Sequence, residues 1–265
     1  MISLFFFIMK YKYALIDLSL LLTRNLHVIS RGKGIGEYSA GDVVRLTIQT
    51  LNKVSRDYGI VADKVILVAD SWSPDYDGYY RTYLLGGKYK DSRKWMTQEK
   101  YDALKEDPKS TSEDLERAAL ELYQNQVKQE TKAILKGEAG VIGLPCLAVP
   151  GLEYDDLCFI ISSLLFTRGE TQKSFIVTKD SDCMYCTSPV CDYFRLPISG
   201  SAPELMTYDG IYANFVPDNL KQRGISLYTY KAMSDALGGG HNDMRRVVRD
   251  LYYIPGIIEE IMDGD

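Results

Sequence analysis

Residues 174–182 read Ser-Phe-Ile-Val-Thr-Lys-Asp-Ser-Asp, and this stretch is the most informative about the fold class. A short apolar run is followed within a few residues by two aspartates, Asp180 and Asp182. Such a run, bounded by polar residues, is typical of a strand buried on both faces of a parallel sheet. Two more runs end in the same way, because residues 13–17 end in Asp17 and residues 64–70 end in Asp70. The sequence therefore predicts three buried strands with carboxylates at their ends.

Segments with helical spacing separate these strands. Residues 40–58 repeat apolar side chains at the period of a helix, and the acidic segment 153–156 opens the apolar stretch 157–166. Strands that alternate with helices predict an α/β fold with a mainly parallel central sheet flanked by helices. In such sheets ligands bind beyond the carboxyl ends of the strands, where the aspartates fall.

A long insertion, residues 71–136, interrupts this alternation. It contains a basic and aromatic stretch at residues 78–94, followed by the helix-start signal Ser-Thr-Ser-Glu-Asp at residues 110–114. The signal predicts a polar helix that continues to about residue 136. Lysine and arginine can hold phosphates, and tyrosine can stack on bases. The alternative is a solvated helical surface with no ligand.

The acidic residues at strand ends and at the start of a helix are candidates for a divalent-metal site. Mg²⁺ prefers oxygen ligands. Two such ions can activate a water and stabilise the leaving oxygen in phosphodiester hydrolysis. The alternative is that these carboxylates cap helices and form ion pairs. The candidates are Asp17, Asp70, Glu153, Asp155, Asp156, Asp180 and Asp182.

In their order along the chain, these motifs resemble the 5′ nuclease superfamily, which includes the flap endonucleases, the 5′ nuclease domains of bacterial DNA polymerases and the phage RNase H-type 5′→3′ exonucleases, and the resemblance is closest to the phage RNase H-type enzymes. The resemblance spans residues 12–243 in separated blocks. The blocks are residues 14–17 (Ala-Leu-Ile-Asp), 69–70 (Ala-Asp), 78–81 (Gly-Tyr-Tyr-Arg), 89–93 (Tyr-Lys-Asp-Ser-Arg), 153–156 (Glu-Tyr-Asp-Asp) and 178–182 (Thr-Lys-Asp-Ser-Asp). The resemblance implies a PIN-like fold with a helical arch insertion and a shortened C-terminal helical part.

The resemblance also implies roles for the matching residues. The seven carboxylates would bind two Mg²⁺ ions, for which Mn²⁺ can substitute. Lys90, Arg93 and Arg81 would lie at the base of the arch as catalytic cations that contact the scissile phosphate or the 5′ end. The residues expected to contact nucleic acid are Tyr79, Tyr80, Lys88, Tyr89, Lys94, Arg245 and Arg246.

The sequence departs from the superfamily near its end. Asp243 matches the last metal-site carboxylate, but Gly240 and Met244 stand where an aspartate and an asparagine are usual. His241 could contact a phosphate or a metal-bound water, or be an ordinary loop residue. In residues 244–265 the arginines provide either a reduced grip on duplex DNA or an exposed amphipathic helix.

The charge balance is consistent with this interpretation. The chain of 265 residues carries 31 Lys and Arg against 36 Asp and Glu, a net charge of −5. An acidic chain is not an obvious nucleic-acid binder. Taking the eight metal-site carboxylates from the 36 acids leaves 28, fewer than the 31 bases. Apolar residues make up 46% of the chain, which excludes a disordered protein.

The sequence therefore predicts a metal-dependent 5′→3′ exonuclease or flap endonuclease with RNase H-type activity, from phage replication or repair. Its core would span residues 10–243, with the arch at 75–136 and a helical tail at 244–265. The expected partners are branched or nicked DNA, RNA–DNA hybrids and a single-strand-binding or clamp protein, with no membrane, in the (host) cytoplasm. The alternatives are a PIN-type endoribonuclease and a non-catalytic nucleic-acid-binding accessory protein, which Gly240 and Met244 favour.

Three other segments allow a simple and a functional interpretation. Cys183 and Cys186, with Cys191 nearby, could suggest a zinc site. A structural zinc site needs four ligands, however, and both histidines are far away in sequence, so buried thiols are the better interpretation. The glycine-rich basic segment 31–36 is either a loop that contacts nucleic acid or a plain surface loop. The apolar run in residues 1–8 is too short to span a membrane and lacks the basic region and cleavage site of a signal peptide. Met9 is a plausible start of the protein.

Overall fold

The computed structural model of the chain describes residues 9–58, 60–76, 78–81, 96–137, 143–196 and 202–231. Residues 1–8 and the predicted tail, 244–265, therefore lie outside the described residues, as does the predicted core boundary at residue 243. Within the described ranges, no helix combines the length and the apolar character that crossing a membrane requires.

Six strands form one mixed sheet in the order β3-β2-β1-β4-β5-β6. The pairs β1–β2, β2–β3 and β4–β5 are parallel, whereas β5 and β6 are antiparallel. The predicted mainly parallel sheet is thus confirmed. The strands are β1 (Met9–Asp17), β2 (Ile60–Val68), β3 (Cys146–Leu147), β4 (Ser174–Thr178), β5 (Cys191–Arg195) and β6 (Glu204–Met206).

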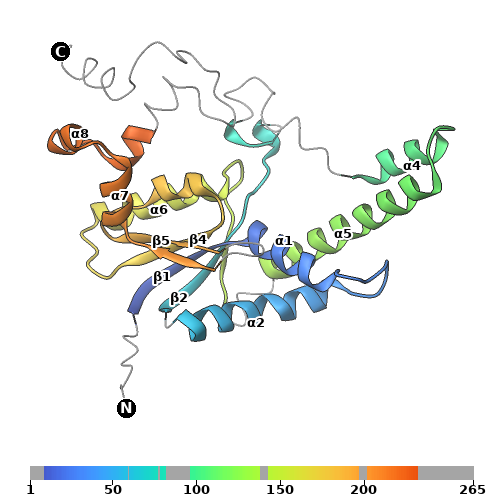
Figure 1. Cartoon of the computed structure of the whole chain (residues 1–265), viewed down its shortest axis with the longest axis horizontal. Coiled ribbons are helices and arrows are strands. Elements are labelled where there is room, and N and C mark those ends of the chain that lie inside the picture. Colours follow the sequence, from blue (N-terminus) through green and yellow to red (C-terminus); the bar gives the residue numbers. More distant parts are fainter. Residues whose placement is uncertain are drawn as a thin grey trace, which may run out of the picture. The chain divides into compact units, whose positions relative to one another are not determined.

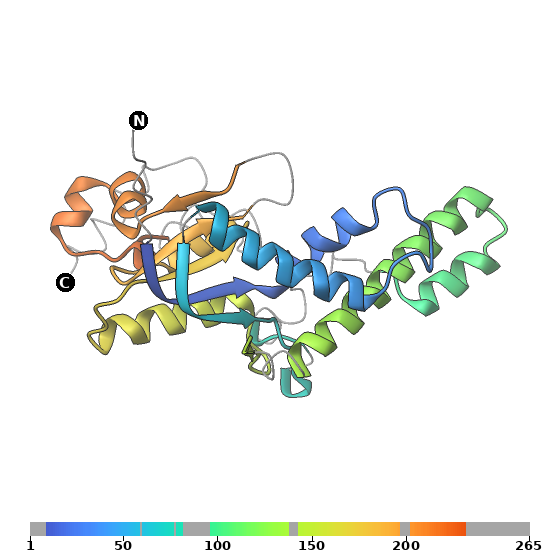
Figure 2. The ribbon, with the colours of Figure 1, turned by 90° about the horizontal axis from the view of Figure 1, so that it is seen from below.

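The chain forms two compact units, the first ending at Tyr154 and the second beginning at Asp155. Among the described residues, the first unit holds β1, β2 and β3 together with helices α1, α2, α4 and α5, which Figures 1 and 2 show in blue to green. Helices α1, α2 and α5 pack on one another, and α4 folds back along α5. These helices are α1 (Leu18–Ile29), α2 (Ala40–Tyr58), α4 (Gln98–Glu106) and α5 (Ser112–Gly137).

The predicted helix at residues 40–58 is confirmed, but its buried face is partly polar. Thr47 and Thr50 are buried on α2 beside Asn25 of α1. The Asn25 amide donates to the Thr47 hydroxyl at 3.0 Å, and the Thr50 hydroxyl donates to the Asn25 carbonyl at 3.0 Å. Buried polar groups are tolerated where they satisfy one another, so apolar periodicity alone could not identify this face.

The start signal at residues 110–114 produces the predicted helix. Thr111 precedes α5, and its hydroxyl accepts a hydrogen bond from the Asp114 N–H at 3.1 Å. In return the Asp114 carboxylate accepts from the Thr111 N–H at 3.2 Å and from the Thr111 hydroxyl at 2.7 Å. This reciprocal arrangement satisfies amides that the first turn leaves unpaired. The predicted arch segment contains η1 (Pro74–Tyr76), α4 and α5.

The second unit is built on β4, β5 and β6. All five residues of β4 are buried, as the opening stretch of sequence predicts. Helix α7 packs on β5. Buried Asp192 on β5 accepts from the Lys173 ammonium at 3.0 Å and from the Tyr208 N–H at 2.9 Å. The helices of this unit are α6 (Tyr154–Thr167), η3 (Ser181–Cys186), α7 (Tyr208–Phe215) and α8 (Asp218–Gln222).

Candidate metal site

Asp17 ends β1 and also caps the helix that follows. Its Oδ1 accepts a hydrogen bond from the Leu20 N–H at 2.9 Å, so α1 begins directly after the strand. An N-cap aspartate satisfies one unpaired amide of the first turn. A carboxylate has about four acceptor positions, so the cap fixes the orientation of the group without using all of its oxygen lone pairs.

Asp70 follows β2 and is held through two of its oxygens. Its Oδ1 accepts from the Tyr154 N–H at 2.9 Å, and its main-chain carbonyl accepts from the Lys132 ammonium at 2.8 Å. The buried Tyr154 hydroxyl in turn donates to the Leu15 carbonyl of β1 at 2.8 Å. The ends of β1 and β2 are thereby tied to the segment that leads into α6.

A turn before α6 brings residues 78–81 to the acidic segment. Gly151 adopts a positive φ of 84°, which other residues rarely adopt. Its N–H donates to the Ser71 carbonyl at 2.8 Å, and its carbonyl accepts from the Tyr80 N–H at 2.7 Å. As a result the Arg81 guanidinium lies 3.5 Å from the carboxylate of Glu153, whose side chain is almost fully buried.

Three of the predicted metal ligands form one acidic group. Ligand oxygens of Glu153, Asp155 and Asp156 all lie within 4.8 Å of one another. Among the described residues, this is the one such group of three or more acidic, cysteine or histidine side chains. Hard cations such as Mg²⁺ bind oxygen ligands of this kind. Like charges this close repel, so the donor set fits a divalent cation.

Asp180 and Asp182 follow β4, in the second unit. Asp180 caps η3, because its Oδ1 accepts from the Asp182 N–H at 3.0 Å. The buried Tyr193 hydroxyl donates to the Asp180 carbonyl at 3.1 Å and fixes the chain at this point. The Lys231 ammonium lies 3.7 Å from the Asp182 carboxylate. Asp180 is exposed and Asp182 is half-buried, so both carboxylates can be reached from solvent.

Sequence reasoning missed two lysines of α5 that lie near the first two aspartates. The Lys128 ammonium donates to the Thr23 hydroxyl at 2.7 Å, and Lys132 donates to the Asp70 carbonyl as described above. Burial lowers the pKa of both ammonium groups, while the charges of Asp17 and Asp70 act in the opposite direction. Their spacing of four residues on a polar helix could have suggested a common face.

The five cysteines are free thiols, as the sequence favours. All of them except Cys146 are buried. A hydrogen bond with Cys186, and then burial, raise the pKa of the Cys183 thiol. Burial raises the pKa of Cys191 to about 12. These are properties of inert core thiols. Within the described residues, the cysteines form no metal-binding group of the kind seen for the carboxylates.

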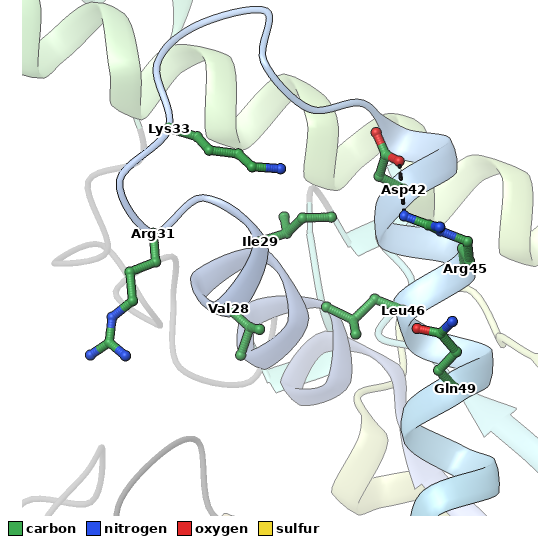
Figure 3. A pocket seen from close by; sticks show the side chains of 8 residues that line it. All are labelled: Val28, Ile29, Arg31, Lys33, Asp42, Arg45, Leu46 and Gln49. Atoms are coloured by element: carbon green, nitrogen blue, oxygen red, sulfur yellow. Dashed lines mark ion pairs between the residues drawn. The ribbon is translucent and has the colours of Figure 1, made fainter.

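The glycine-rich loop at residues 31–36 borders a surface cavity of about 300 Å³ (Figure 3). Val28, Ile29 and Leu46 provide its apolar lining. Figure 3 shows Lys33 reaching toward α2, whereas Arg31 points away. Asp42 and Arg45, which form a 3.6 Å ion pair, lie at the other side. Contact of this loop with nucleic acid stays a prediction.

The other predicted residues have different outcomes. Tyr79, Tyr80 and Arg81 are described, and Tyr80 is exposed. Their predicted roles toward nucleic acid stay predictions. Several predicted residues lie outside the described ranges: Lys88, Tyr89, Lys90, Arg93, Lys94, Asp243, Arg245 and Arg246.

The chain resembles solved structures of phage 5′ nucleases. It matches the bacteriophage T5 flap endonuclease in a pseudo-enzyme-product complex with DNA and metal ions at a TM-score of 0.59 and 16% identity, over 94% of this chain and 75% of that one. It matches the T5 5′-exonuclease with bound zinc at a TM-score of 0.59 and 17% identity, over 96% and 79% of the two chains. The 5′ nuclease resemblance is confirmed at the level of the fold.

No protein-family model matches the chain, and neither does any curated protein sequence. At this low sequence identity, similarity in structure establishes the PIN-like 5′ nuclease fold alone, because one fold can host different functions.

Proposed function

We propose that the chain is a divalent-metal-dependent 5′ nuclease that hydrolyses phosphodiester bonds. The observation that carries this proposal is the acidic group of Glu153, Asp155 and Asp156, within 4.8 Å of one another, in a chain with the fold of phage 5′ nucleases. Function is carried by the site rather than by the fold. The chemistry of the donor set therefore weighs more than the similarity.

Three sets of carboxylates would hold the metal ions. The acidic group before and within the first turn of α6 would be one, and Asp180 with Asp182 would contribute from the end of β4. Asp17 and Asp70 would complete the set, each oriented by a backbone N–H. When bound, two Mg²⁺ or Mn²⁺ ions supply a water of lowered pKa and stabilise the developing charge on the leaving oxygen.

Arg81 would serve the substrate's phosphate. It already lies beside the acidic group, where its guanidinium offers planar donors suited to a phosphate. Tyr80, exposed and next to it in sequence, would stack on a base. Lys90 and Arg93 would join them as catalytic cations. The substrates would be 5′-flap or nicked DNA and RNA–DNA hybrids during phage replication or repair in the host cytoplasm, with a single-strand-binding or clamp protein as a partner.

The test is cleavage of three labelled substrates: 5′-flap DNA, an RNA–DNA duplex and single-stranded RNA. Each is incubated with the wild type in Mg²⁺ or in a chelator. The variants are Asp155→Asn and Asp180→Asn, with Asp209→Asn on the exposed first turn of α7 as the matched control. We expect cleavage of flap DNA and the hybrid in Mg²⁺, and at least a roughly hundredfold loss in both site variants but not in the control.

Two results would redirect the proposal. Cleavage confined to single-stranded RNA would favour a PIN-type endoribonuclease. Binding of DNA without metal-dependent cleavage would favour a non-catalytic accessory protein. If the wild type cleaves nothing in Mg²⁺ or Mn²⁺, or if the site variants behave like the wild type, the proposal is wrong.

A further inference from the structure

Two lysines on consecutive turns of α5 are hydrogen-bonded to the segments that carry the strand-end aspartates of the first unit, one to α1 after Asp17 and the other to Asp70 itself. Lys128 is fixed by its 2.7 Å bond to the Thr23 hydroxyl, and Lys132 by its 2.8 Å bond to the Asp70 carbonyl. The Thr23 hydroxyl itself donates to the Ser19 carbonyl at 2.7 Å, so it acts as an acceptor for Lys128. Both ammonium groups therefore have a set position, unlike those of exposed lysines.

Burial and neighbouring carboxylates shift the pKa values of these two lysines in opposite directions. Burial lowers the pKa of Lys128, the charges of Asp17 and Asp70 act to raise it, and the charge of Lys132 acts with burial. Burial lowers the pKa of Lys132 as well, while the charge of Asp70 acts to raise it and the charge of Lys136 to lower it. Burial disfavours the charge on both. Aspartates and lysines thus stabilise one another in a partly dry setting, where charge interactions are stronger than in water.

We propose that Lys128 and Lys132 are built-in counter-cations of Asp17 and Asp70, which offset the aspartates' charge when no metal is bound and compete with the metal for it. This inference rests on the proposed function, because it treats Asp17 and Asp70 as metal ligands. The role that it assigns to α5 is compensation of the aspartates' charge, which differs from the phosphate contact predicted for residues 78–94. The lysines are positioning residues, since they act through the aspartates.

The physical reason is the repulsion within an acidic site. Carboxylates gathered around an absent cation destabilise the fold, and nearby positive charge offsets this cost. The same positive charge repels an incoming divalent ion. A counter-cation should therefore weaken metal binding, whereas a lysine that only supports the fold should strengthen it by keeping the ligands in place. The two roles predict opposite signs.

The experiment measures Mn²⁺ affinity of the full chain by calorimetry. The variants are Lys128→Met, which keeps length and loses charge, and Lys128→Arg, which keeps charge. The matched control is Lys53→Met, at an exposed position of α2, where the Lys53 ammonium lies 4.0 Å from the Asp57 carboxylate. We expect Lys128→Met to bind Mn²⁺ on the order of fivefold more tightly than the wild type. Lys128→Arg and Lys53→Met should bind as the wild type does.

Unchanged or weaker Mn²⁺ binding by Lys128→Met would overturn the inference. If the wild type binds no Mn²⁺, the proposed metal site fails, and a second measurement still tests the counter-cation. The melting temperature in a chelator is measured for Lys128→Met alone and in the Asp17→Asn background, since asparagine also caps a helix. Lys128→Met should lower the melting temperature more, by at least about 2 °C, when Asp17 is present than when Asp17→Asn has removed its charge. An equal effect in both backgrounds would also overturn the inference.

Discussion

Arg81 and Glu153 form an ion pair of 3.5 Å in which the carboxylate is almost fully buried and the guanidinium is about one-third exposed, at 34%. The pair joins the predicted substrate-binding segment to the acidic group. Glu153 depends on Arg81 more than Arg81 depends on Glu153, because water cannot solvate a buried carboxylate that has lost its cation.

Replacing Arg81 with methionine should therefore destabilise the metal-free protein. Breaking a fully buried pair costs about 3–5 kcal/mol. The partial exposure of Arg81 reduces the expectation to about 1–2 kcal/mol. Urea unfolding in a chelator measures it. Adding Glu153→Gln to Arg81→Met should recover part of the loss. A free energy of unfolding that Arg81→Met leaves unchanged would show that the pair does not support the fold.

Metal should stabilise the chain by binding the folded state. At a free Mn²⁺ concentration one hundred times its dissociation constant, linkage gives about 2.7 kcal/mol. We expect a rise in melting temperature on adding Mn²⁺ that a chelator reverses. Asp156→Asn should reduce this rise strongly, because it removes one ligand of the acidic group. The control Asp209→Asn should keep it. Equal rises in both variants would place the metal elsewhere.

The start of α5 should respond to acid in a defined direction. Hydrogen bonds from the hydroxyl and the N–H of Thr111, the two largest causes, lower the pKa of Asp114 below its ordinary value of 3.8. A lowered folded pKa means that Asp114 contributes stability above pH 3.8, and that this contribution is lost as the pH falls through the folded pKa. NMR titration should show the pKa of Asp114 rising toward 3.8 in Thr111→Val.

Asp218 offers a control for that titration. Its pKa is lowered by a different partner, Lys221, through a hydrogen bond and then through charge. Thr111→Val should leave it unchanged. If the pKa of Asp114 does not rise while that of Asp218 stays constant, the capping interaction at Thr111 is not the cause of the shift.

Thiol reactivity should follow burial. Burial raises the pKa of Cys146 as it does that of Cys191, and a hydrogen bond with Cys186 and burial raise that of Cys183, so accessibility decides: Cys146 is half-buried, whereas the other four cysteines are buried. The thiolate is the reactive form. An aromatic disulfide reagent should thus titrate one thiol in the native protein and five after unfolding. Cys146→Ser should abolish the native reaction, and two or more fast thiols in the folded wild type would contradict this assignment.

The sequence predicts much of the fold where periodicity is strong. Residues 174–178 form β4 with the predicted bounds, and residues 40–58 form α2. The short strands β3 and β6 gave no signal, because two or three residues cannot show a period of two. Helix α1 was not predicted because its apolar residues follow the β1 run without a break other than Asp17, which acts as the cap.

The candidate site is predictable in its residue types and not in its contacts. The strand ends place Asp17 and Asp70, because parallel strands present their carboxyl ends at one edge. The pairing of Arg81 with Glu153 depends on hydrogen bonds of Gly151 to Ser71 and Tyr80, which join segments far apart in sequence. Such long-range contacts leave no local pattern, and the same holds for Lys132 and the Asp70 carbonyl.

The helix caps at Asp17 and Asp180 give these two residues a structural role beside the one that we propose for them in metal binding. Each Oδ1 starts a helical segment by accepting a backbone N–H. Asparagine would keep the capping oxygen and exchange the other oxygen for an amide nitrogen. A chain carrying asparagine at both positions should fold with the same elements and have two fewer negative charges. Exchanging one carboxylate oxygen for an amide group in each side chain is therefore expected to keep the capping role and to remove the charge that the proposed metal binding needs.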